Sequence, residues 1–121
     1  MKLAKNFCLA VVLSLGCAAA MAADCVAPKK PANPPDGKKA TQEEMVVAMR
    51  ESKQFDADVK AYQACLNTET EEMIVALGVD AKPEAIERVK SRQNKKADDA
   101  FEDATKVADA FNVQLRAFKT K

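Results

Sequence analysis

The chain has 121 residues, with 19 basic and 18 acidic side chains and a formal net charge of +1 at pH 7. This balance argues against nucleic acid as the main partner, because nucleic-acid-binding domains carry a basic excess. Histidine is absent, which removes the commonest general base and the commonest metal ligand. We therefore expect one small domain that is not an enzyme and binds no cofactor.

Residues 1–22 have the order of a secretory signal peptide. Lys2 and Lys5 precede the apolar run FCLAVVLSLG, and the small residues CAAAMAA follow before Asp24. A positive start, an apolar stretch and an A-x-A site define such a peptide, so we expect cleavage after Ala22. The apolar run is shorter than the roughly 20 residues of a membrane-spanning helix. The sequence predicts a periplasmic or secreted chain without a transmembrane segment.

A lipid anchor at Cys17 is the disfavoured alternative. The stretch LSLGC, ending at Cys17, resembles the lipid-attachment box of bacterial lipoproteins. Such boxes carry leucine three residues before the cysteine, whereas Ser14 occupies that position here. A lipid would anchor the chain to a membrane without making it span the bilayer.

Cysteine usage predicts a disulfide. Cleavage after Ala22 removes Cys8 and Cys17 and leaves Cys25 and Cys65. In an exported chain, the remaining pair is expected to be oxidised. Two alternatives stay open, namely two free buried thiols and a bridge between two copies, because two cysteines do not fix connectivity.

Residues 23–40 are expected to form an extended, proline-rich arm. Four of the five prolines lie between Pro28 and Pro35, and the turn signal Asp36-Gly37 follows. This composition favours a polyproline II conformation and opposes a helix.

A first helix is expected over about residues 42–77. Thr41 and Glu44 have the spacing of a capping box, which predicts the helix start. Gly78 follows the expected end, where glycine can adopt the left-handed conformation. The expected seam positions alternate three and four residues apart, as in a coiled coil. These positions are Met45, Ala48, Ser52, Phe55, Val59, Tyr62, Leu66, Glu69, Met73 and Ala76.

A second helix is expected over about residues 81–118. Asp80 is the predicted N-cap, and Pro83 lies in the first turn, where a missing amide hydrogen does no harm. Two long helices joined by a short turn must pack antiparallel to bury their apolar stripes. A turn near Val79 and Asp80 determines which residues of the two helices face each other, and it places large side chains opposite small ones. The predicted pairs are Phe55 with Ala104, Val59 with Ala100, Tyr62 with Ala97, Ser52 with Val107, Ala48 with Phe111, Met73 with Ile86 and Glu69 with Lys90.

The predicted fold class is all-α. Residues 41–121 form an antiparallel, coiled-coil-like two-helix hairpin, and a Cys25–Cys65 disulfide clips the arm back along the first helix. A two-helix hairpin is rarely stable alone, so the arm supplies cover. We expect the basic arm to lie on an acidic flank of the first helix. The arm carries Lys29, Lys30, Lys38 and Lys39, and the flank carries Glu44, Glu51, Asp58 and Glu72.

We assign no catalytic, cofactor-binding or metal site. The acidic pairs Glu71-Glu72 and Asp98-Asp99 are expected to be solvated, because no EF-hand loop surrounds them. The candidate site is a partner surface beside the seam, on the side away from Cys65. Its residues are Met49, Phe101, Ala108 and Leu115. The alternative is that these residues merely widen the core stripe.

Several stretches resemble a family of small secreted or periplasmic proteins of Gram-negative bacteria with no assigned activity. They are the cysteine and spaced prolines of the arm, PDG, ATQEEM and YQACL. The resemblance covers roughly residues 24–66, and it implies an exported helical hairpin without catalytic residues. Two functions are compatible with it. The first is binding of a protein partner through the hairpin edge, and the second is a structural or lipid-anchored envelope element that acts by oligomerising.

Overall fold

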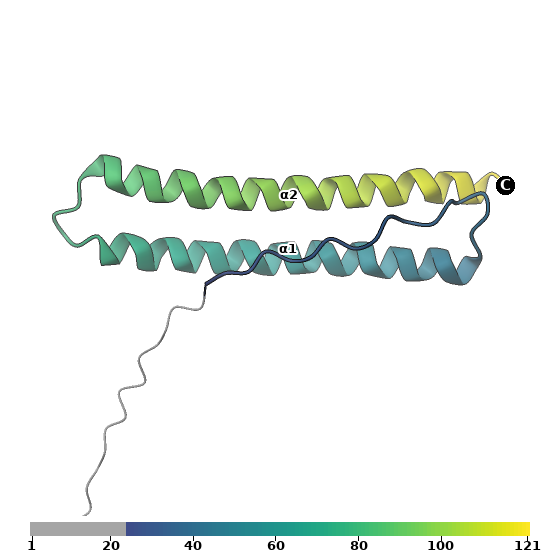
Figure 1. Cartoon of the computed structure of the whole chain (residues 1–121), viewed down its shortest axis with the longest axis horizontal. Helices are drawn as coiled ribbons and strands as arrows, with labels where there is room; N and C mark the ends of the chain where they lie inside the picture. Colours follow the sequence, from purple (N-terminus) through teal and green to yellow (C-terminus); the bar gives the residue numbers. More distant parts are fainter. Residues whose placement is uncertain (1–23) are drawn as a thin grey trace, which may run out of the picture.

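The computed structural model describes residues 24–121 as two long helices that lie side by side, with an extended arm along them (Figure 1). Helix α1 spans Gln42–Ala76 and helix α2 spans Pro83–Lys119. The chain reverses between them, so the helices are antiparallel (Figure 1). The predicted fold class is confirmed. The expected signal peptide and Cys17 lie outside the described residues.

Helix α1 begins with the predicted capping box. The Glu44 amide donates to the Thr41 hydroxyl at 3.2 Å, and the Thr41 amide donates to the Glu44 carboxylate at 2.7 Å. Both bonds satisfy amides that a helix start leaves without intrahelical partners. The hydrogen bonds from Thr41 hold the pKa of Glu44 below its ordinary value, because they favour the ionised carboxylate.

The turn between the helices differs in part from the prediction. Gly78 adopts the expected left-handed conformation, with a φ of 88°. However, α2 starts at Pro83 with Lys82 as N-cap, and no side chain caps this end, so the assignment of Asp80 as N-cap was wrong. The residue before a proline is driven out of the helical region by steric clash. Lys82 accordingly has an extended ψ of 139°, which prevents the helix from starting at residue 81.

The core lies along the seam, and residues of several predicted pairs fall in common clusters. One cluster contains Phe55, Val59, Tyr62, Leu66, Ala100 and Ala104, with Cys25, Ala97 and Val107 packed against it. A second cluster, near the open end, contains Ala40, Met45, Ala48 and Phe111, with Leu115 and Phe118 against it. Large side chains of one helix thus meet alanines of the other, which permits close packing.

Glu69 does not pair with Lys90, so that part of the register was wrong. The Gln93 amide donates to the Glu69 carboxylate, and the Lys96 ammonium lies 3.9 Å from the same group. Val89 and Gln93 are the buried residues in this part of α2. Lys90 follows Val89 and is turned about 100° away from the seam. It pairs instead with Glu87 at 3.4 Å.

None of the helices formed by residues 24–121 is both long and apolar enough to span a membrane.

Candidate interaction surfaces

The disulfide joins Cys25 to Cys65 within one chain, across a Cα–Cα distance of 5.8 Å. This finding rules out the two alternatives of free thiols and a bridge between copies for the structure described here. Cys25 also packs against the first core cluster. The bridge therefore fixes the start of the arm beside the middle of α1, as predicted.

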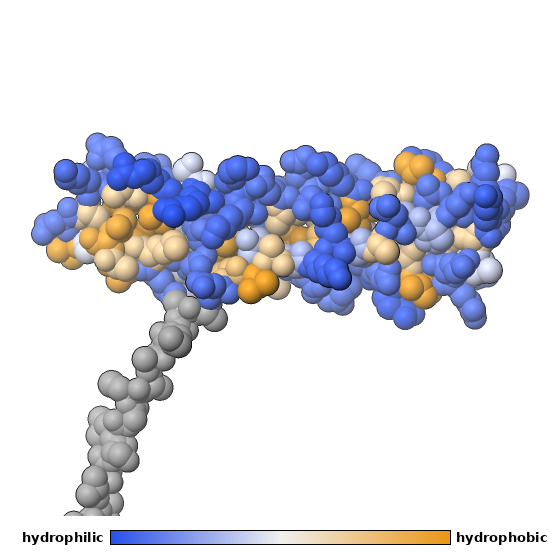
Figure 2. Space-filling model, in the orientation of Figure 1, coloured by the Kyte–Doolittle hydropathy of each residue, from blue (hydrophilic) through white to orange (hydrophobic). Residues whose placement is uncertain are grey.

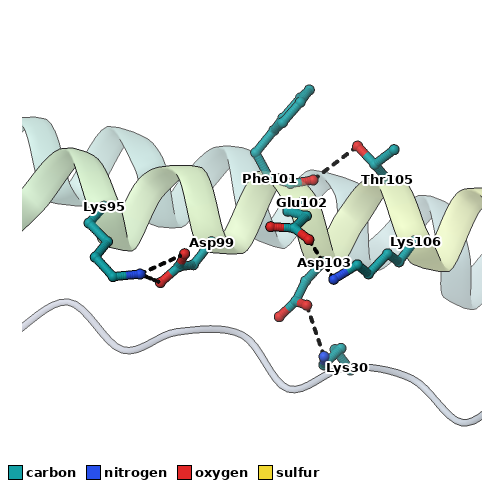
Figure 3. Close-up of polar contacts among 8 residues, drawn as sticks. All are labelled: Lys30, Lys95, Asp99, Phe101, Glu102, Asp103, Thr105 and Lys106. Atoms are coloured by element: carbon teal, nitrogen blue, oxygen red, sulfur yellow. Dashed lines mark hydrogen bonds and ion pairs between the residues drawn. The ribbon is translucent and has the colours of Figure 1, made fainter.

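The arm lies against both helices: Ala27 and Pro28 line a cavity with residues of α1 and α2, while Asn33 and Pro35 line a pocket with Glu44 and Glu51 of the acidic flank. The Lys30 ammonium forms a 2.9 Å ion pair with Asp103 of α2 (Figure 3). Lys39 pairs within the arm, at 3.8 Å from Asp36. Among residues 24–121, no ion pair joins an arm lysine to the acidic flank, so the expected charge pairing was wrong although the arm reaches that flank.

The end of the arm next to α1 is anchored on α2. The Gly37 amide donates to the Gln114 side-chain oxygen at 2.9 Å. Gly37 is buried, and a Cβ atom there would overlap the Gln114 carbonyl oxygen. Ala40 is buried in the second core cluster, and its carbonyl accepts from the Lys121 ammonium. Residues 36–40 are therefore part of the packed structure.

A cavity of about 220 Å³ lies between the arm and the two helices. Ala27 and Pro28 line it on the arm side, while its apolar lining includes Phe55, Val59 and Tyr62. The remaining lining residues are Lys96, Asp99, Ala100 and Asp103. We call this hollow, together with the seam beneath residues 25–35, the arm groove. Aromatic side chains and carboxylates thus face an extended, proline-containing segment.

The opposite side of the seam carries the predicted partner surface, which we call the open flank: Met49, Phe101, Ala108 and Leu115. The Phe101 ring is 61% exposed and points away from the arm (Figure 3). Met49 is 37% exposed. Phe101, Ala108 and Leu115 are spaced seven residues apart, so they share one side of α2.

The structure divides the open flank into two kinds of residue. Ala108 and Leu115 are half-buried, and Leu115 packs against the second core cluster. Leu115 therefore widens the core stripe, whereas Met49 and Phe101 remain accessible.

A further apolar surface lies at the hairpin turn and was not predicted. Val75, Leu77 and Val79 are 78%, 41% and 103% exposed. Figure 2 shows apolar surface gathered at this end of the molecule. The apolar run around Gly78 was the available signal, but it was interpreted only as a helix end.

The clustered carboxylates of α2 are engaged in surface ion pairs. Asp99 accepts from Lys95 at 2.9 Å, and Glu102 accepts from Lys106 at 2.6 Å (Figure 3). Hydrogen bonding to these carboxylates raises the pKa of Lys95 and of Lys106, since it favours the charged ammonium. Within residues 24–121, no group of three or more acidic, cysteine or histidine side chains is placed to hold a metal ion.

Comparison with known proteins gives no relative, because no protein-family model, curated protein or solved structure matches this chain. The resemblance to small exported proteins therefore stays a prediction.

Proposed function

We propose that this chain is a non-enzymatic periplasmic or secreted protein that binds another protein through its open flank. The observation that carries the proposal is the 61% exposure of the Phe101 ring beside a packed seam. Exposed aromatic residues next to an apolar stripe are typical of protein-binding surfaces. The arm covers the other side of the seam, so it leaves this flank accessible to an incoming helix.

Substitution of Phe101 tests the proposal. Phe101→Ser removes the exposed ring while leaving the buried clusters intact, so we expect loss of partner binding with an unchanged melting temperature. Val113→Ser is the matched control, because Val113 is also on α2 and is 50% exposed. Leu115 is unsuitable for this purpose because it packs against the second core cluster.

The measurement is affinity capture from a native envelope extract with the oxidised chain as bait. A protein retained by the unsubstituted chain and by Val113→Ser, and lost with Phe101→Ser, supports the proposal. Equal retention by all three baits contradicts it. Light scattering on the same samples identifies self-association, because a dimer that dissociates with Phe101→Ser assigns the open flank to a second copy.

A further inference from the structure

We propose that the arm groove is a second interaction surface, which takes an extended, basic, proline-containing partner segment carrying a cysteine, and that the arm is its tethered competitor. This surface lies on the other side of the seam from the open flank. The two proposals therefore stand or fall separately.

The seated arm shows the chemistry that the groove accepts. Ala27 and Pro28 line the same cavity as Phe55 and Tyr62, and Lys30 pairs with Asp103 at 2.9 Å. Aromatic-lined grooves bind proline-rich segments well, because the polyproline II conformation is already formed before binding. The groove thus combines an apolar floor for proline with a carboxylate for a basic side chain.

The arm makes few polar contacts with the helices between its two ends. Among the described residues, the Lys30–Asp103 ion pair is the single polar contact that joins residues 25–35 to the helices, apart from the disulfide. Its side chains are 56% and 35% exposed, and exposed pairs contribute little to binding. Residues 36–40 are anchored separately through Gly37 and Ala40. Opening the disulfide therefore frees residues 25–35 without removing the anchor.

Cys65 is exposed on α1, whereas Cys25 is half-buried, so we place the exchange at the Cys65 sulfur. An incoming thiolate bonds to the Cys65 sulfur, and the Cys25 sulfur leaves as a thiolate that takes a proton from water. One disulfide replaces another, so no net oxidant or reductant is consumed. The partner segment then occupies the groove and is held by the same cysteine that held the arm.

A covalent trap with the full, unsubstituted chain tests this inference. The probe is the synthetic peptide Asp24–Asp36, which retains its cysteine, added in excess to the oxidised chain in a glutathione redox buffer. The control peptide has the same composition and cysteine position with the other residues scrambled. We expect about tenfold more adduct at Cys65 with the native order, measured by intact mass and peptide mapping.

Charge reversal gives a second readout that does not depend on the scrambled peptide. In Asp103→Lys the arm and the native peptide lose the same ion pair, so a peptide carrying Lys30→Glu, which can pair with the new lysine, should be captured about fivefold more than the native peptide. Asp109→Lys is the matched control on α2, and it should leave capture unchanged. Equal capture of native and scrambled peptides overturns the proposal. A covalent dimer of the chain in place of the adduct would also overturn it, because the occupant would then be a second copy.

Discussion

The Gly37 amide and the Gln114 side chain meet at 2.9 Å, and this contact brings the arm to α2 before the chain turns into α1. The approach is so close that a Cβ atom on Gly37 would lie 2.8 Å from the Phe118 backbone nitrogen. Glycine is needed here because only a residue without a side chain lets two backbones come this near. The position where the arm crosses the seam is therefore set by this residue.

Substitution of Gly37 should loosen the arm. We expect Gly37→Ala to lower the free energy of unfolding by about 1–3 kcal/mol, because the added methyl forces backbone movement in a packed site. Chemical denaturation measures this loss, and hydrogen exchange should show faster exchange of the arm amides.

The matched control is Gly78→Ala at the other end of the hairpin. Gly78 has a φ of 88° and nothing within 4 Å of an added Cβ, so its cost is backbone strain alone. That strain is about 1 kcal/mol, and exchange in the arm should not change. Faster arm exchange in both variants, or in neither, would contradict the role assigned to Gly37.

Local signals in the sequence predicted the helices well. The Thr41–Glu44 capping box and the glycine at residue 78 are short-range features, and the structure contains both. The seam was also predictable, because the spacing of Phe55, Val59 and Tyr62 fixes one buried stripe.

Features that depend on contacts between distant residues were predicted less well. The disulfide correctly placed the arm beside α1, but charge wrongly predicted its ion pairs, because Lys30 pairs with Asp103 of α2. Pro83 determines where α2 starts, in place of Asp80, because its steric effect on the Lys82 backbone outweighs a capping hydrogen bond. Local spacing could not show that Gln93 would replace Lys90 opposite Glu69.

The Cys25–Cys65 bond should be the largest single contribution to stability. It closes a loop with a sequence separation of 40, and loop-closure entropy gives about 4 kcal/mol for such a loop. We expect the Cys25→Ser, Cys65→Ser double variant to lose about this amount in urea unfolding.

Reduced, unsubstituted chain is the control for the two serines, and it should unfold at the same urea concentration as the double variant. Helical content at low denaturant should be retained, because both helices keep their seam. A loss below about 1 kcal/mol would show that the arm is held mainly by its other contacts.

The buried polar contact between Glu69 and Gln93 should stabilise the fold little or not at all. Gln93 is 2% exposed, and its side-chain oxygen has no hydrogen-bond partner in the described part of the chain. Removing the carboxylate by Glu69→Leu leaves the Gln93 amide unpaired as well. We expect a loss of about 1–3 kcal/mol from this single change.

The double variant Glu69→Leu, Gln93→Leu should recover that loss or exceed the original stability, because it replaces both polar partners with apolar groups. Denaturation of the unsubstituted chain, Glu69→Leu, Gln93→Leu and the double variant gives the coupling energy directly. If the double variant is less stable than the unsubstituted chain, the polar contact is a net stabilising interaction and this interpretation is wrong.

The capping box should make the stability of the fold depend on pH. The hydrogen bonds from Thr41 hold the pKa of Glu44 below its ordinary value of 4.5 in the folded chain. A group whose pKa is lowered on folding stabilises the fold above its unfolded pKa, and this contribution disappears as pH falls through the folded pKa. The unsubstituted chain should therefore melt at a higher temperature than Glu44→Gln at neutral pH, and the difference should shrink once the pH falls below about 4.5.

Glu43→Gln is the matched control, because Glu43 lies in the same helix turn and does not take part in the capping box. Melting curves measured between acid and neutral pH test this. The prediction would be contradicted if the melting temperatures of Glu44→Gln and Glu43→Gln differed from that of the unsubstituted chain by the same pH-dependent amount.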